Sequence, residues 1–122
     1  MTREPYWYVA TPYSKYPEGV TAAFTEACRA TAALLKHGIR VYSPIAHTHP
    51  IAIHGGLDVK DLSIWLPADR PLMQAAVGMI VVKMKGWEES TGIAHEIEAF
   101  KKAGKPVLEM EWPPSTTGEN NV

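Results

Sequence analysis

Cysteine, long apolar runs and an excess of one charge are all scarce in this sequence of 122 residues. The single cysteine, Cys28, excludes an internal disulfide and fits a reducing compartment. No apolar run reaches the roughly 18 residues that a membrane-spanning helix needs, and the N-terminal segment MTREPYWYVA lacks a signal-peptide core. The formal net charge of −1 gives no electrostatic attraction to a nucleic-acid backbone. We therefore expect a cytoplasmic protein that binds neither membranes nor nucleic-acid polymers.

What is present is the composition of one globular domain. Hydrophobic residues make up 46% of the chain and charged residues 20%, which is typical of a soluble protein. The length allows one hydrophobic core but not two. The final segment EWPPSTTGENNV is polar and rich in proline. We therefore predict a single domain over residues 1–110 and a mobile tail over residues 111–122.

Runs of β-branched and aromatic residues alternate with segments of helical spacing. The runs predict strands at residues 6–10, 39–43, 78–84 and 106–110. The spacing predicts helices at residues 19–37, 61–76 and 90–103. Residues 44–60 show no clean periodicity and are expected to form a long loop. Because Pro67 and Pro71 cannot both fit one regular helix, we expect the second helix to break or kink at Pro67.

This alternation of strands and helices predicts an α/β fold. It is typical of a three-layer α/β/α sandwich, Rossmann-like or flavodoxin-like, with a mainly parallel sheet of four to five strands. Right-handed crossovers place every strand-to-helix loop at the carboxyl edge of the sheet, where ligands bind in such folds. The candidate site loops are therefore residues 11–18, 44–60 and 85–91.

One carboxylate in the segment ESTGIAHEIEAF lies where an apolar residue is expected. On a helical wheel, Ile93, Ile97 and Phe100 define the face toward the sheet, and Glu96 falls within that arc. Glu98 falls on the opposite side, where water and nearby lysines surround it. Glu96 is therefore the unusual glutamate of the segment.

Asp69 is placed in a similar way on the preceding helix. It lies near the middle of an apolar arc that includes Trp65, Leu66 and Met73. A cap or an arginine such as Arg70 could satisfy either carboxylate in a purely structural role. Both nevertheless lie on helices that follow loops at the site edge, so a shared cleft with acid, base or nucleophile chemistry is the alternative that we favour.

The residues before Glu96 form a second signal. Gly92 is unfavourable in a first helical turn, but it makes sense where a ligand approaches the backbone closely. With the hydroxyls of Ser90 and Thr91, this helix N-terminus is a candidate phosphate-binding site. An ordinary Ser or Thr N-cap with a tolerated glycine explains the same residues.

The histidines of residues 44–60 allow three interpretations. His47, His49 and His54 could bind a metal, contact a substrate or face solvent. The predicted loop holds no cysteine and only one acidic residue, Asp58, so we expect no metal site. His47, next to the end of the predicted strand, is our candidate substrate contact. Trp65 could stack on a base or belong to the core.

Three motifs together resemble the nucleoside 2-deoxyribosyltransferase superfamily, in particular its nucleotide N-hydrolase-like members in a bacterial and phage branch. YVATPY is similar to the first strand and loop of that superfamily. LPADRPLMQAAVGMIVV is similar to its helix with a substrate-contacting aspartate and its central strand. STGIAHEI is similar to the motif in which a glycine precedes the nucleophilic glutamate by four residues. The correspondence covers about residues 6–110.

The resemblance implies a role for each matching residue. Glu96 would be the nucleophile that attacks the anomeric carbon and forms a glycosyl-enzyme. Asp69 would contact the base or ribose, and either Asp69 or a histidine would deliver a proton to the leaving base. Thr11 and Tyr13 would line the pocket, and Tyr13 would orient Glu96. The chemistry needs no cofactor and no metal.

Ser90 departs from the transferases of the superfamily in an informative way. Members that act on unphosphorylated nucleosides carry aspartate six residues before the nucleophile, whereas serine there resembles the branch that hydrolyses nucleoside 5′-monophosphates. An aspartate would repel a phosphate, so the exchange is physically sensible. The resemblance thus implies a small-molecule nucleotide or nucleoside as the partner.

Four functions remain open from the sequence. The first is a nucleotide N-glycosidase, and the second is a transferase that moves deoxyribose between bases. The others are a non-catalytic nucleotide-binding module on the same fold and a structural partner protein. Because so small a domain has limited walls for a closed pocket, we also expect a homodimer or homotetramer.

Overall fold

Four parallel strands form one sheet in the computed structural model, which describes residues 4–114. The strands are β1 (Trp7–Ala10), β2 (Val41–Tyr42), β3 (Gly78–Lys83) and β4 (Val107–Glu111). The helices are α1 (Val20–Lys36), α2 (Pro44–Gly55), α3 (Leu62–Ala75) and α4 (Thr91–Lys102). The strand order is β2-β1-β3-β4, and all pairs within it are parallel. The predicted α/β/α fold class is confirmed.

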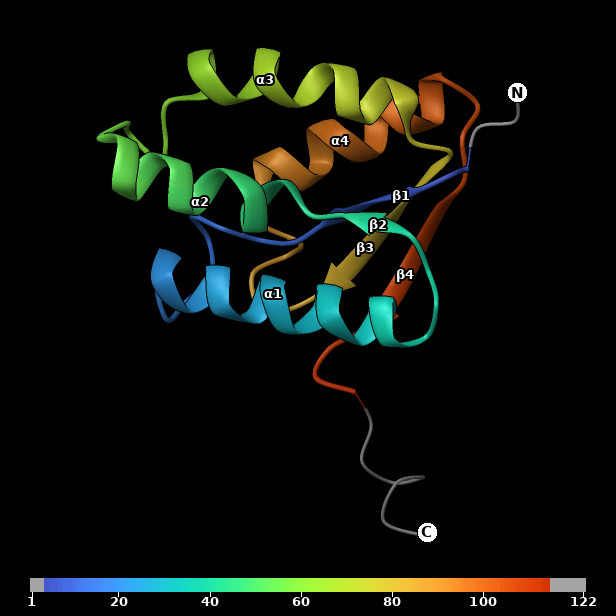
Figure 1. Ribbon diagram of the computed structural model, residues 1–122, viewed down its shortest axis with the longest axis horizontal. Coiled ribbons are helices and arrows are strands. Elements are labelled where there is room, and N and C mark those ends of the chain that lie inside the picture. The colour runs from blue at the N-terminus through green and yellow to red at the C-terminus, as the bar shows by residue number, and fades with distance from the viewer. Residues whose placement is uncertain (1–3, 115–122) are drawn as a thin grey trace, which may run out of the picture.

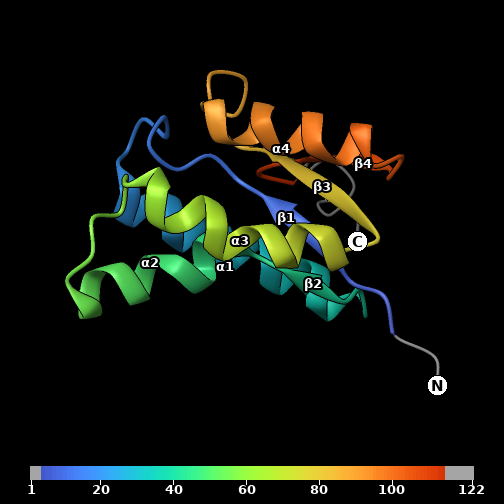
Figure 2. The same cartoon turned by 90° about the horizontal axis from the view of Figure 1, so that it is seen from above.

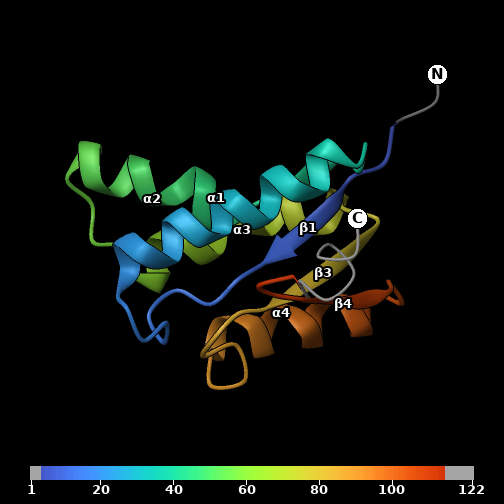
Figure 3. The same ribbon diagram turned by 90° about the horizontal axis from the view of Figure 1, so that it is seen from below.

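The helices cover the two faces of the sheet unequally. Figure 1 shows α1 on one side of the sheet and α3 and α4 on the other. Seen from above, α3 lies in front of the sheet, whereas α1 is in front when the molecule is seen from below (Figures 2 and 3). Helix α2 contacts α1 and β1 and extends away from the end of β2. The carboxyl edge of the sheet is therefore bordered by several helices.

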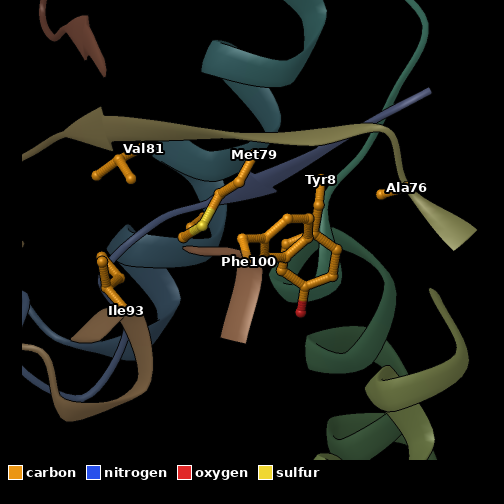
Figure 4. Close-up of a cluster of buried hydrophobic side chains, with 7 residues drawn as sticks. Tyr8, Ala76, Met79, Val81, Ile93 and Phe100 are labelled. Atoms are coloured by element: carbon orange, nitrogen blue, oxygen red, sulfur yellow. The ribbon is translucent and has the colours of Figure 1, made fainter. Parts of the chain in front are cut away.

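Strict alternation along the strands divides the core into two clusters. On the α4 face, Tyr8 and Met79 are fully buried and pack with Phe100 (Figure 4). On the α1 face, Val9 and Val82 are fully buried in the second cluster. Because successive strand side chains point to opposite faces, β1 and β3 contribute to both clusters. The sheet is thus a true central layer.

Residues 44–60 do not form the predicted loop, since most of them lie in α2. Ser43 caps this helix by accepting a hydrogen bond from the Ala46 amide at 3.1 Å, and Pro44 takes the first position, which tolerates proline. Gly56 ends it in the left-handed conformation at φ 71°. The apolar pattern is weak because α2 buries only a narrow face and leaves Ile53 56% exposed. The residues that begin and end α2 therefore indicate this helix better than its apolar periodicity does.

The predicted break at Pro67 is also wrong, because α3 runs without interruption from Leu62 to Ala75. Pro67 and Pro71 are four residues apart and both are exposed. The carbonyls of Ser63 and Pro67, which lose their helical donors, therefore lie on a side that water can reach. The helix contributes no buried residue to the core. Two prolines are tolerated because this helix is only lightly packed.

The end of the domain extends slightly beyond the predicted boundary at residue 110. Glu111 belongs to β4, and Trp112 packs against the α1-face cluster. The Trp112 indole Nε1 donates a hydrogen bond of 2.9 Å to the Glu26 carboxylate. Residues 115–122 of the predicted tail lie outside the described residues. Within the described chain, no helix combines the length and apolarity that crossing a membrane requires.

Candidate functional site

A pocket of about 200 Å³ opens at the carboxyl edge of the sheet. Its walls come from the loop after β1, from α2, from α3 and from the first turns of α4. Seven of the eight residues predicted for the site line it: Thr11, Tyr13, Trp65, Asp69, Ser90, Gly92 and Glu96. Segments more than 80 residues apart in the sequence therefore meet at one place.

Glu96 lies on the sheet-facing side of α4, as its position on the helical wheel predicts. Its neighbours Ile93 and Phe100 on that side are each 2% exposed. The hydroxyl of Tyr8 donates a hydrogen bond of 2.9 Å to Glu96 Oε2. Tyr8 is itself fully buried, and its ring centroid lies 5.6 Å from that of Phe100. Figure 4 draws both side chains in the buried cluster. The core of the protein thus supplies the donor that holds this carboxylate.

The tyrosine that orients Glu96 is therefore Tyr8 and not Tyr13. Tyr13 lines the pocket, but its hydroxyl lies 2.5 Å from Nδ1 of His49. Tyr8 was missed because it looks like an ordinary core residue in the strand pattern. The signal that could have revealed it is its hydroxyl, since a tyrosine oxygen inside a core needs a hydrogen-bond partner.

Two buried oxygen atoms at the pocket lack a hydrogen-bond partner among the described residues. They are Oδ1 of Asp69 and Oγ1 of Thr11, and both residues line the pocket. Thr11 is only 5% exposed. Buried polar atoms are nearly always satisfied in native proteins. A polar ligand or ordered water in the pocket would satisfy both atoms.

The two carboxyl groups of the pocket have raised pKa values. Burial raises the pKa of Glu96 to about 8; the hydrogen bond from Tyr8 opposes this rise, and the charge of Asp69 adds to it. Burial likewise raises the pKa of Asp69 to about 6, and the nearby His47 counteracts it. With pKa values of about 8 and about 6, the two carboxyls hold one proton between them near neutral pH, and Glu96 carries it.

The first turn of α4 shows the N-cap role considered for Ser90. Ser90 is the N-cap, and its Oγ accepts a hydrogen bond from the Ile93 amide at 3.1 Å. The Ser90 hydroxyl still has its own proton to donate. The backbone conformation of Gly92 does not require glycine, and an added Cβ would meet nothing closer than Ser90 Oγ at 3.8 Å. The fold therefore leaves open space beside the amides of Thr91 and Gly92.

The structure places His49, rather than His47, at the pocket. His47 is exposed and its Nδ1 lies 3.0 Å from the hydroxyl of Tyr42. His49 is 7% exposed and lines the pocket. The predicted loop favoured His47, next to the strand end, whereas the observed helix turns residues 47 and 49 to different sides. Among the described residues, no three His, Cys, Asp or Glu side chains are arranged to hold a metal ion.

Trp65 forms part of the pocket wall and is only partly buried. Its Nε1 donates a hydrogen bond of 2.9 Å to the carbonyl of Asp58, in the connection between α2 and α3. The indole is therefore held in place without being a core residue. An aromatic face in this position can stack on a planar ligand.

Residues 6–112 match the family described as Domain of unknown function (DUF1937). The chain belongs to this family. The DUF1937 match spans every strand and helix described above and includes all the pocket residues. None of the curated proteins matches the chain. The function of this DUF1937 domain is therefore inferred from the chemistry of its pocket.

The raised pKa of Glu96 predicts how the stability of the fold depends on pH. Between pH 4.5 and about 8 the folded protein holds a proton that the unfolded chain releases. The free energy of unfolding should therefore fall as pH rises through this window. Glu96→Gln removes the ionisable group and with it this loss of stability. We expect the variant to be more stable than the parent at pH 8 by about 1 kcal/mol or more. Urea denaturation at pH 5 and pH 8 measures both proteins. If the free energy of unfolding changed equally with pH in the parent and in Glu96→Gln, the raised pKa of Glu96 would be contradicted.

Proposed function

We propose that this protein is a nucleotide N-glycosidase that cleaves the base from a (deoxy)ribonucleoside 5′-monophosphate. The observation that carries the proposal is the meeting of Glu96 and Asp69 at one pocket beside the first turn of α4. Paired carboxyls of raised pKa suit the cleavage of a glycosidic bond. The helix N-terminus and its hydroxyls suit a phosphate. The resemblance to the nucleoside 2-deoxyribosyltransferase superfamily supports the same chemistry.

The hydrogen bond from Tyr8 supports one division of roles between the two carboxyls. It stabilises the ionised form of Glu96, whereas Asp69 Oδ1 has no donor among the described residues. We therefore assign the charge to Glu96 and the shared proton to Asp69 in the productive state. This assignment runs against the order of the two pKa values, which describe the pocket without its substrate. A bound base that accepts a hydrogen bond from Asp69 would favour the protonated form of that residue.

The reaction proceeds in two steps. A carboxylate oxygen of Glu96 bonds to the anomeric carbon of the sugar while the bond to the base nitrogen breaks, and its electron pair leaves with the base. Asp69 gives its proton to the leaving base. Water then attacks the anomeric carbon, its proton returns to Asp69, and the bond to Glu96 breaks. The products are the free base and the sugar 5-phosphate.

A transferase would share the first step but would replace water by a second base. Ser90 favours a phosphate-bearing substrate, since the Ser90 hydroxyl and the amides of Thr91 and Gly92 are donors without negative charge. A nucleotide substrate also agrees with the cytoplasmic location expected from the composition. A non-catalytic nucleotide-binding module would use the same pocket without turnover.

We further propose that a homodimer or homotetramer completes the pocket. The pocket of about 200 Å³ is partly open to solvent in the single chain. Leu62 and Leu66 line the pocket yet are 55% and 37% exposed, so apolar surface at its rim is uncovered in one chain. Sedimentation equilibrium should give two or four chains per particle. A monomer at concentrations where the protein is active would contradict this proposal.

Replacing Glu96 by alanine tests the function most simply. We expect Glu96→Ala to lower base release by more than about 10³-fold, because the nucleophile is lost, while nucleotide binding is largely retained. Glu98→Ala, an exposed position on the same helix, is the matched control and should be as active as the parent. Chromatography of nucleosides and their 5′-monophosphates, with and without an added acceptor base, measures the released base. Full activity in Glu96→Ala would overturn the mechanism, and turnover only with an acceptor base would show a transferase.

Replacing Ser90 by aspartate tests the proposed phosphate-binding site. Aspartate is as good an N-cap as serine, so the helix should be retained. Its charge should repel the phosphate and lower kcat/KM for 5′-monophosphates by roughly 10²-fold, while nucleosides without phosphate are affected much less. Ser90→Asn is the matched uncharged control. If both substrates lost activity equally, the phosphate would lie elsewhere.

A further inference from the structure

His49 belongs to a small aromatic cluster that the proposed reaction does not use. Three separate parts of the fold contribute to it: Tyr13 from the loop after β1, Phe24 from α1 and His49 from α2. The His49 ring stacks on Phe24 with 4.5 Å between ring centroids and an angle of 21°. Tyr13 meets its edge at 5.7 Å and 76°. The imidazole is therefore held in one orientation at the wall of the pocket.

The hydrogen bond to Tyr13 determines which nitrogen of this ring carries the proton. Burial lowers the pKa of His49 and raises the pKa of Tyr13, so the imidazole is neutral and the phenol is protonated at neutral pH. If Nδ1 carried the proton, the Tyr13 proton would have no acceptor among the described residues. If Tyr13 donates, its proton and the bare Nδ1 are both paired. This direction is favoured, since a bare imidazole nitrogen is a stronger acceptor than a phenol oxygen. The favoured arrangement leaves the proton of His49 on Nε2.

Nε2 is then the ring atom left for a ligand. It has no hydrogen-bond partner among the described residues, and it is not among the polar atoms that are both buried and unpaired. His49 lines the pocket and is 7% exposed. A fixed, uncharged N–H group in such a place pairs with acceptor atoms and not with amino groups.

We propose that His49, with its tautomer fixed by Tyr13, donates the Nε2 hydrogen bond to an acceptor atom of the bound nucleotide's base. The acceptor is a carbonyl oxygen or an unprotonated ring nitrogen. The inference rests on the proposed function and makes His49 a binding residue of the same pocket. Tyr13 is a positioning residue, since it acts on the ligand only through the imidazole. A base that presents an amino group to Nε2 leaves that donor unpaired and is disfavoured.

The tautomer can be measured directly in the free protein. Long-range ¹H–¹⁵N NMR at pH 7 should show His49 neutral, with Nε2 protonated and Nδ1 bare, and the His49→Asn spectrum identifies its signals among the five histidines. In Tyr13→Phe the preference for this tautomer should weaken, because the donor to Nδ1 is gone. A His49 that carries its proton on Nδ1, or on both nitrogens, would overturn the inference whatever the protein catalyses.

Two substitutions separate the two ring nitrogens. His49→Gln places an amide N–H near the position of Nε2, whereas His49→Asn keeps an acceptor near Nδ1 for Tyr13 and loses the donor to the ligand. Assayed on the common ribo- and deoxyribonucleoside 5′-monophosphates, His49→Asn should have a kcat/KM roughly ten- to hundredfold below that of His49→Gln. Comparable thermal melting of the two variants shows that both are folded.

The outcomes distinguish this inference from the function on which it rests. If the two variants were equally active, or equally impaired, the donor role of Nε2 would be wrong even though base release continued. If the parent released base from none of the monophosphates, the proposed function would fail together with the role in ligand binding, while the measured tautomer would stand. If one variant does not fold, the NMR tautomer of His49 in the parent and in Tyr13→Phe tests the inference instead.

Discussion

The hydrogen bond from Tyr8 to Glu96 is the interaction on which the pocket depends. A carboxylate on the sheet-facing side of a helix is costly unless a donor meets it. Here the donor comes from the fully buried side chain of β1, whose ring packs on Phe100 of the same helix as Glu96. The core that stabilises the fold thus also positions the proposed nucleophile. The buried carboxyl is kept at a cost in stability at neutral and higher pH, which is common at functional sites.

The second carboxyl is carried by a very different element. Asp69 lies on α3, which buries no residue and is held mainly at its C-terminal end. There the Tyr6 hydroxyl donates to the Leu72 carbonyl, and the Lys105 ammonium donates to the Met73 carbonyl at 3.2 Å. Few buried contacts mean low local stability, so this wall of the pocket can adjust more readily than α4. The proposed nucleophile is therefore on the rigid side and the proton donor on the adjustable side.

The sequence was sufficient for the strands, for three of the helices and for both carboxyls. Glu96 and Asp69 could be predicted because each interrupts an apolar helical face, a local pattern of one or two turns. Helix α2 could not, since it packs through only a few residues and its outer face is as apolar as its inner one. That error led to His47 in place of His49. The role of Tyr8 depends on a contact 88 residues away in the chain, which no local pattern reveals.

The covalent intermediate provides the most direct test of the central claim, that Glu96 is the nucleophile. Protein quenched in acid during turnover of a 5′-monophosphate can be digested and its peptides weighed by mass spectrometry. The account predicts the added mass of a pentose phosphate, or of its deoxy form, on the peptide that contains Glu96. The same mass on the peptide that contains Asp69 would contradict it, as would steady base release with no modified peptide under conditions that preserve an acyl-linked sugar.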